Sequence, residues 1–308
     1  MLRIASLLPS ATEIAFALGL GDQVVAVSHE CDYPPEASTR PILTKSAIHQ
    51  KTHRSLDVDR EVEKRGGDIY EIDEKLLEEL KPDLILTQEL CAACAVSYTK
   101  VKEAARVLDA DTKIVSLEPN NLEEIIDNIR LVGKIASRAS EAEELALRLS
   151  QRIDRVKEKT RRVQYRPRIF FMEWLEPPWA GGHWIPQMAN YAGGVEGLGN
   201  LGRPSQKISW NRVADYQPEI IVLSPCGFDL KGVKAESHVL ASYPNWDKIP
   251  AYKNSKIYAV NASAYFSRPG PRVVDGLELL AHIIHPEIFP EEPPDDRMER
   301  LDPAFIKA

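Results

Sequence analysis

Short apolar segments alternate with helical patterns along most of the chain, and the same order occurs twice. Apolar runs of this length, bounded by polar turns, predict buried strands. These runs are 3–8, 23–27, 84–87 and 113–117 in the first half, and 168–172, 220–224 and 256–260 in the second. Short apolar strands separated by helices are typical of parallel sheets that are covered on both faces. The pattern therefore predicts an α/β protein of two lobes, with mostly parallel sheets flanked by helices.

Residues 121–163 lie between the two halves and carry two consecutive helical patterns. Asn121 is the predicted cap of the first helix, and Ser140 with Glu143 forms a predicted capping box for the second. A continuous helix over 141–162 would be roughly 33 Å long, which is enough to join two lobes. We therefore predict that one long helix connects the lobes as a rigid strut.

The same pattern divides the chain into four segments. They are an N-terminal α/β lobe (1–118), a helical connector (119–164), a C-terminal α/β lobe (165–285) and a tail (286–308). The tail is rich in Pro and acidic residues, so we expect it to be irregular. Residues 36–70 are polar and show no clear period, so they too are expected to be irregular.

Composition narrows the class of partner. The chain has 308 residues, 44% of them hydrophobic and 28% charged, with a net charge of −7. This acidic balance argues against nucleic acid and against acidic membrane surfaces. No apolar run approaches the ~20 residues of a membrane-spanning helix, and a strand pattern follows Met1 directly, without the pattern of a signal peptide. As written, the protein is expected to be cytoplasmic, or periplasmic or extracellular if a leader was removed.

The predicted architecture also indicates where a ligand would bind. Ligands of open parallel sheets bind beyond the carboxyl ends of the strands, and pockets are frequent between domains. The loops predicted at these ends are 28–35, 88–96, 173–186, 225–229 and 261–271. From them we take ten candidate ligand-binding residues: Glu30, Tyr33, Gln88, Trp174, Trp179, His183, Trp184, Tyr265, Phe266 and Arg268.

The loop 173–184 is the most informative of these segments. It contains three tryptophans, and Gly181 and Gly182 would allow the backbone to approach a ligand closely. Aromatic faces suit a large flat ligand, and His183 would donate a hydrogen bond or bind a metal. The alternative is that the tryptophans form an aromatic plug that seals the interface between the lobes.

Cys91 and Cys94 follow a predicted strand and open a predicted helix. This placement lowers the pKa of a thiol and suits metal or redox chemistry, whereas the alternative is that both are small buried residues in a crowded turn. A second hypothesis is therefore a metal-dependent enzyme or metallochaperone that uses Cys91, Cys94, His29 or His183.

Motifs for catalysis are missing from the sequence. It contains no Walker loop, no dinucleotide-binding glycine fingerprint and no nucleophile elbow. Ser10 and Glu13 are polar residues that capping of a helix over 11–18 would explain. The sequence therefore favours binding without catalysis, and no cofactor is required.

Four segments together resemble the helical-backbone substrate-binding proteins of ABC importers, in their vitamin B12-binding branch. The segments are 3–14, 32–35, 80–86 and 177–194, and the resemblance extends over about 1–285. It implies two α/β lobes on one helix, little hinge motion, and a ligand held between the lobes. At matching positions it implies that Trp179 and Arg268 line the cleft.

The resemblance also concerns the ligand and a permease. Gln88 and Ala264 stand where corrinoid-binding members would have Trp and Asp. Importer members present one exposed Glu per lobe to the permease, but here the helix after Cys94 has no acid before Glu103 and the second-lobe helix begins with Ser209-Trp-Asn-Arg212. The first two departures argue against strict corrinoid specificity, and the missing acids argue against docking on a permease. Because aromatic strand-end loops would face each other across the cleft, we predict that the protein binds a corrinoid or another metal chelate of that size. The remaining alternative is an importer component whose leader was removed.

Overall fold

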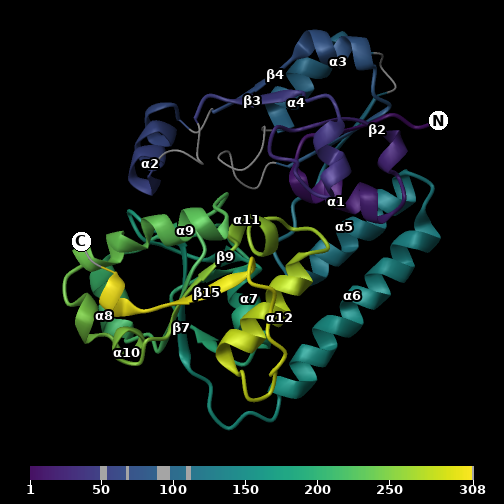
Figure 1. Ribbon diagram of the computed structural model, residues 1–308. Coiled ribbons are helices and arrows are strands. Elements are labelled where there is room, and N and C mark those ends of the chain that lie inside the picture. The colour runs from purple at the N-terminus through teal and green to yellow at the C-terminus, as the bar shows by residue number, and fades with distance from the viewer. Residues whose placement is uncertain (49–53, 67–68, 89–97, 109–111, 307–308) are drawn as a thin grey trace.

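A computed structural model describes residues 1–48, 54–66, 69–88, 98–108 and 112–306. It shows two α/β lobes joined by a helical connector (Figure 1), which confirms the predicted fold class. Cys91 and Cys94 lie outside the described residues.

Both lobes contain the same arrangement of four parallel strands. In the N-terminal lobe the order is β2 (Val24–Val27), β1 (Ile4–Ser6), β5 (Leu84–Thr87) and β6 (Lys113–Ser116). In the C-terminal lobe it is β10 (Val195–Glu196), β7 (Arg168–Trp174), β13 (Ile220–Leu223) and β14 (Ile257–Val260). The repetition predicted from the apolar runs is therefore confirmed. Because the strands of each set are parallel, their carboxyl ends lie together at one edge of the sheet.

The C-terminal lobe carries additional short strands. These are β8 (Trp179–Ala180), β12 (Gln206–Lys207) and β15 (Met298–Leu301) in the main sheet, and the pair β9 (Gly182–His183) and β11 (Asn200–Leu201) beside it. The prediction of an irregular tail is wrong for β15, which pairs antiparallel with β14 from Leu301 to Met298. Pro and acidic residues dominate the tail composition, but this short strand completes the hydrogen bonding of β14, which otherwise would form the sheet edge.

Residues 36–70 are also more regular than predicted. They contain η2 (Pro35–Thr39), β3 (Thr44–Ser46), α2 (Ser55–Lys64) and the start of β4 (Tyr70–Ile72). β3 and β4 pair antiparallel, and α2 projects from them to lie over the C-terminal lobe (Figure 1). Only Ser55 and Val58 of α2 are buried, and six of its ten residues are charged, so the segment reads as polar in the sequence.

The remaining helices cover the sheets and form the connector. The α-helices are α1 (Pro9–Ala17), α3 (Glu74–Leu80), α4 (Tyr98–Ala104), α5 (Leu122–Ile135), α6 (Ala139–Thr160), α7 (Ile185–Tyr191), α8 (Trp210–Tyr216), α9 (Leu230–Glu236), α10 (Pro250–Lys253), α11 (Ala262–Tyr265) and α12 (Val273–Ile284). The short 3-10 helices are η1 (Gly21–Gln23), η4 (Ala105–Val107), η5 (Ser237–Ser242), η6 (Trp246–Lys248) and η7 (Pro303–Phe305). The predicted long helix is α6, whose 22 residues span about 33 Å.

One of the three predicted helix caps is confirmed and two are wrong. Asn121 caps α5 as predicted, because its side chain accepts a hydrogen bond from the backbone N–H of Glu124. The capping box of α6 is wrong: the helix begins at Ala139 without a side-chain cap, and Glu143 pairs with Arg130 of α5 instead. The predicted capping of a helix over 11–18 by Ser10 and Glu13 is also wrong, since α1 begins at Pro9, whose ring is suited to the first turn, and has no side-chain cap.

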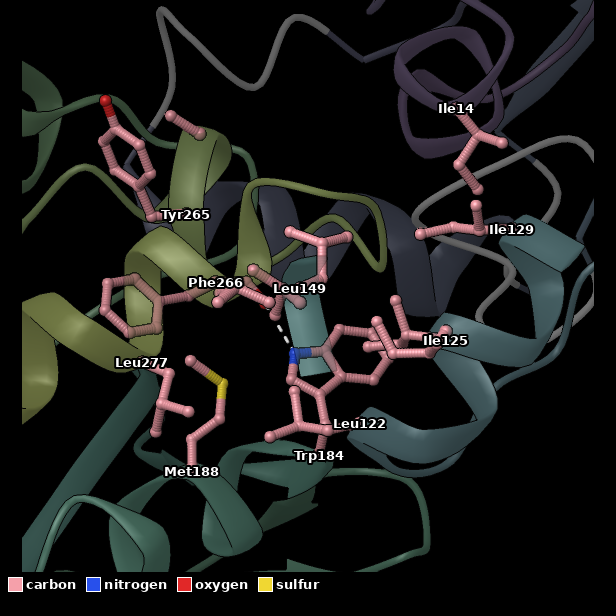
Figure 2. Close-up of a cluster of buried hydrophobic side chains, with 14 of the residues drawn as sticks. Ile14, Leu122, Ile125, Ile129, Leu149, Trp184, Met188, Tyr265, Phe266 and Leu277 are labelled. Atoms are coloured by element: carbon pink, nitrogen blue, oxygen red, sulfur yellow. Dashed lines mark hydrogen bonds between the residues drawn. The ribbon is translucent and has the colours of Figure 1, made fainter. Parts of the chain in front are cut away.

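One hydrophobic cluster runs through both lobes and the connector (Figure 2). Ile14 of α1 and Ile129 of α5 belong to it, as do Leu149 of α6, Met188 of α7 and Leu277 of α12. α6 contacts α5, α7 and α12 along its length. The connector is therefore part of a continuous core that includes residues of both lobes, which restricts how freely the lobes move relative to each other.

Candidate functional site

A cavity lies where the strand ends of the two lobes face each other. The N-terminal lobe lines it with Leu8, Pro9, Ser10, Glu30, Tyr70 and Gln88; the C-terminal lobe lines it with Phe171, Glu173, Gly182, His183, Trp184, Ile185, Ser205, Ser224, Cys226, Gly227, Ser263, Phe266, Ser267, Arg268 and Pro269. All five loops predicted at the strand ends supply lining residues. We call this space the interlobe cavity; its volume is about 90 Å³.

The ten predicted residues divide into two groups. Glu30, Gln88, His183, Trp184, Phe266 and Arg268 line the cavity. Tyr33, Trp174, Trp179 and Tyr265 are not among its lining residues. The topology thus placed the loops at the cavity, but within each loop only some side chains face it.

Trp184 and Phe266 line the cavity from within the core. The indole N–H of Trp184 donates to the carbonyl oxygen of Phe266 over 2.9 Å, and both residues belong to the cluster that joins the lobes (Figure 2). Their exposed fractions are 6% and 1%. They therefore build the wall of the cavity and present little free aromatic surface to it.

Trp174 and Trp179 occupy other positions. The indole of Trp174 donates to the carbonyl oxygen of Ser55 over 3.1 Å and packs edge-on against Phe228. The ammonium nitrogen of Lys207 lies over Trp179, 5.7 Å from the centre of the indole ring. Trp174 packs on hydrophobic clusters of both lobes, so this residue fits the alternative in which a tryptophan seals the interface.

Two arginines of the C-terminal lobe reach acidic residues of the N-terminal lobe. Both terminal nitrogens of Arg268 bond to the carboxylate of Asp32, and Nη2 also donates to the carbonyl oxygen of Glu30 over 3.0 Å. Arg272 donates to Glu13 from Nε over 3.1 Å and from Nη2 over 2.6 Å. We call Arg268, Arg272, Glu13 and Asp32 the arginine bridge. Arg268 is where the sequence placed it, but in this structure it holds the lobes together.

The two tyrosines of the prediction lie beside this bridge. The guanidinium of Arg272 stacks 3.9 Å from the ring centre of Tyr33 and lies 5.8 Å from that of Tyr265. Such contacts shield a cation from water and keep its side chain in one orientation. Tyr33 and Tyr265 thus support Arg272 instead of facing the cavity.

Glu13 bonds to Arg272 of the opposite lobe and does not cap α1 as predicted. It is 3% exposed and lies on the buried face of α1, and burial raises the pKa of its carboxyl against the opposing effect of Arg272 and Arg268. The signal was present in the sequence, because Glu13 stands among Ala11, Ile14 and Ala15, the apolar positions of its helix. A charge on an apolar face indicates a partner elsewhere in the fold.

A second contact between the lobes is made by the first residue of α2. The backbone N–H of Ser55 donates to the carboxylate of Glu236, its carbonyl accepts from Trp174, and its hydroxyl accepts from the N–H of Glu176 over 3.0 Å. We call Ser55, Trp174, Glu176 and Glu236 the α2 bridge. Burial raises the pKa of Glu236. The arm that carries α2 therefore reaches across and closes one side of the cleft.

Glu173 is a half-buried acid of the cavity wall that is not among the ten predicted residues. Its carboxylate accepts hydrogen bonds from the N–H of Gly182 over 3.0 Å and from the Ser205 side chain. Burial raises the pKa of Glu173 to about 7. Gly182 is needed here, because a Cβ at this position would lie 2.2 Å from the backbone nitrogen of Ser205.

His183 is held in an unusual conformation beside it. Its φ of 49° lies in the left-handed region, which is uncommon for residues other than glycine, and its ring stacks on Trp184 at 5.6 Å. Burial lowers the pKa of His183, which favours the neutral imidazole. Its Nε2 is buried without a hydrogen-bond partner among the described residues, as is Oγ of Ser224. Strained residues of this kind are frequent at ligand-binding sites.

The metal hypothesis gains little from the structure. Within the described ranges, no three His, Cys, Asp or Glu residues are grouped so as to hold a metal ion. His29 bonds through Nδ1 to the Thr44 hydroxyl over 2.7 Å and stacks on Tyr70. Two of the four residues in that hypothesis, His29 and His183, are described, and of these two His183 lines the cavity.

A comparison with known proteins decides the family. The family model described as "Periplasmic binding protein" matches residues 4–264. The chain belongs to this family. A vitamin B12-binding protein of Vibrio cholerae is 29% identical over 283 residues, which cover 90% of this chain and 86% of the relative. An uncharacterised ABC transporter substrate-binding lipoprotein of Bacillus subtilis is 26% identical over 296 residues, covering 94% and 82%.

Solved structures show the same architecture. The crystal structure of a periplasmic vitamin B12 binding protein of Vibrio cholerae has a TM-score of 0.67 at 27% identity and covers 94% of this chain and 98% of that chain. A periplasmic heme-binding protein of Roseiflexus sp. RS-1 has a TM-score of 0.70 at 22% identity, covering 94% and 99%. This member of the periplasmic binding protein family thus shares its two-lobed fold with proteins named for two different metal chelates.

The relatives also bear on location. Their names place them in the periplasm or describe a lipoprotein, so the expectation of a cytoplasmic protein finds no support in them. None of the helices in the described part of the chain combines the length and apolar character that crossing a membrane requires.

Proposed function

We propose that this protein binds a corrinoid, or a metal chelate of similar size, between its two lobes and does not change it chemically. One observation carries the proposal. The strand-end loops of both lobes meet at a single interlobe cavity, in a chain that is 27–29% identical over most of its length to vitamin B12-binding proteins. Family members are binding proteins, and the sequence contains no catalytic motif.

The size of the cavity adds a condition to this proposal. Pockets for organic ligands usually measure about 300–1,000 Å³, whereas the interlobe cavity measures about 90 Å³. A corrinoid is therefore admitted only when the lobes separate. The arginine bridge and the α2 bridge hold them together, so at least one of these bridges must open.

The proposal includes the place where the protein acts. We infer that it works outside the cytoplasm as the substrate-binding component of an importer, which its family and relatives support. The absence of an acid at the start of α8 argued against permease docking. Stimulation of the permease ATPase by the loaded protein, compared with the ligand-free protein, would test this point.

Thermal unfolding tests the binding itself. Ligand at ~100 times its dissociation constant stabilises a protein by about 2.7 kcal/mol, so cyanocobalamin or dicyanocobinamide should raise the melting temperature by several degrees. Haem tests whether another chelate of similar size is bound. FMN, which is flat but contains no metal, is the control and should leave the melting temperature unchanged. Melting curves that none of the three chelates shifts at 0.1 mM, about the highest practical concentration, would contradict the proposal.

A further inference from the structure

The wall that the C-terminal lobe contributes to the interlobe cavity contains polar groups with unused hydrogen-bonding capacity. Nε2 of His183 and Oγ of Ser224 are buried and have no partner in the part of the chain that the structure describes. The two side chains are only 9% and 1% exposed, and both line the cavity. Glu173 lies in the same wall. Its carboxylate accepts two protein hydrogen bonds, and a carboxylate can accept about four.

Buried polar atoms without partners are rare in folded proteins, because each loses its hydrogen bonds to water. Nine such side-chain atoms occur among the described residues, and two of them, Nε2 of His183 and Oγ of Ser224, lie in this one wall next to the carboxyl group of Glu173. Their positions are also well fixed: Ser224 directly follows β13, and hydrogen bonds to Arg203 and Gly202 hold the backbone of His183. The wall is thus preorganised for a polar group that the protein does not itself supply.

The charge of the surroundings limits what that group is. Among the described lining residues, Arg268 is the cation, and Asp32 and Glu13 already neutralise it. Glu30 and Glu173 line the cavity as acids. A carboxylate arm of a ligand would meet these carboxyl groups without a free cation to compensate, whereas an uncharged arm would not.

We propose that this wall, formed by Glu173, His183 and Ser224, receives an uncharged carboxamide arm of the bound chelate. A carboxamide has two N–H donors and one C=O acceptor. Glu173 accepts from its N–H, while the Ser224 hydroxyl and Nε2–H of neutral His183 donate to its C=O. The cleft consequently prefers chelates with carboxamide arms to chelates with carboxylate arms. This inference rests on the proposed function and specifies the class of chelate.

Two corrinoids provide a matched test. Dicyanocobinamide and dicyanocobyrinic acid share the ring and the metal, but the arms of the first end in carboxamides and those of the second in carboxylates. Isothermal titration at pH 7.5 should show binding of dicyanocobinamide that is tighter by at least about tenfold. The preference should persist in 0.5 M NaCl, since salt screens distant charges more than direct contacts.

Variants locate the origin of the preference. Glu173→Gln replaces an acceptor with a group that both donates and accepts, so it should reduce the preference by about tenfold, mainly through tighter binding of dicyanocobyrinic acid. Glu196→Gln is the control, because Glu196 is a similarly enclosed acid whose pKa burial also raises to about 7, but it does not line the cavity. The control should keep the full preference.

The outcomes separate this inference from the proposed function. Equal or tighter binding of dicyanocobyrinic acid to the unmodified protein would overturn the inference and leave the proposed function standing. An unchanged preference in Glu173→Gln, or the same loss in Glu196→Gln, would also overturn it. Failure of both corrinoids to bind would overturn the proposed function and the inference together.

Discussion

The arginine bridge and the α2 bridge close the same cleft with different chemistry. The arginine bridge consists of four charged side chains, and Arg268 and Glu13 within it have side chains only 8% and 2% exposed. The α2 bridge is built around the backbone and hydroxyl groups of Ser55, with Glu236 as its one directly bonded charge. One bridge is therefore ionic and the other mostly neutral.

The difference determines what opening each bridge costs. Charges buried in an ion pair have lost their hydration. When the pair separates in water, the hydration free energy of both ions is regained, and this offsets the lost attraction between them. The neutral groups that bond at Ser55 regain less hydration free energy when they become exposed to water. The arginine bridge thus fixes the orientation of the lobes at a small net gain in stability, and we expect it to open more easily than its polar contacts suggest.

Removal of one partner from the arginine bridge should have the largest effect. Glu13→Ala leaves Arg272 buried without its carboxylate partner and leaves Arg268 with Asp32 alone. A loss of about 3–5 kcal/mol in the free energy of unfolding is expected, which is typical of a buried pair that loses one member. Urea denaturation at pH 7 measures it. Glu143→Ala is the control: it breaks an exposed pair with Arg130 and should leave the free energy of unfolding nearly unchanged. Equal losses in the two variants would mean that Glu13 contributes no more to stability than a surface acid does.

The fold was largely predictable because its signal is local. Strands that are buried on both faces are short apolar runs, and their order along the chain implied two parallel sheets and the loops between them. β15 and α2 were missed for the same reason: neither has enough buried apolar residues to produce a pattern. α2 buries only Ser55 and Val58: Val58 packs on the N-terminal lobe, whereas Ser55 bonds to the C-terminal lobe.

The site was predictable as a place but not as a set of side chains. The bonds that decide it join residues far apart in the sequence: Ser55 and Glu236 are separated by 181 positions, and Arg272 and Glu13 by 259. Nothing in a single sequence links such pairs. The tryptophans of the loop 173–184 were therefore assigned to a ligand, whereas Trp174 contacts Ser55 and the enclosed Glu173 was not selected.

The α2 bridge should respond to pH through Glu236. Burial raises the pKa of Glu236 above 4.5, so the folded state binds this proton more strongly than the unfolded state does. The contribution of Glu236 to stability is therefore greatest below about pH 4.5 and falls as the pH rises through the raised pKa. The fall amounts to about 1.4 kcal/mol for each pH unit that separates the pKa of the folded state from that of the unfolded state. Glu236→Gln keeps an acceptor for Ser55 but cannot titrate.

Urea denaturation of both proteins between pH 4 and pH 8 isolates this effect. The unmodified protein should lose stability relative to Glu236→Gln as the pH rises. Glu176 and His238 are the nearby titratable groups, and they are the same in both proteins. Parallel pH profiles would show that Glu236 titrates as an exposed acid and that the α2 bridge is not sensitive to pH.

The smallest effect is expected from the charges at the edge of the α2 bridge. Lys207 pairs with Asp59 over 3.1 Å and with Glu63, but its side chain is 42% exposed, and such pairs contribute about 0–1 kcal/mol. Lys207→Met removes the charge and keeps the apolar stem over Trp179, so it should cost less than about 1 kcal/mol, and 1 M NaCl should abolish the difference. A large loss that salt removes would show that charge also holds α2 in place. The two bridges would then be alike in kind, and the easier opening expected of the arginine bridge would lose its physical basis.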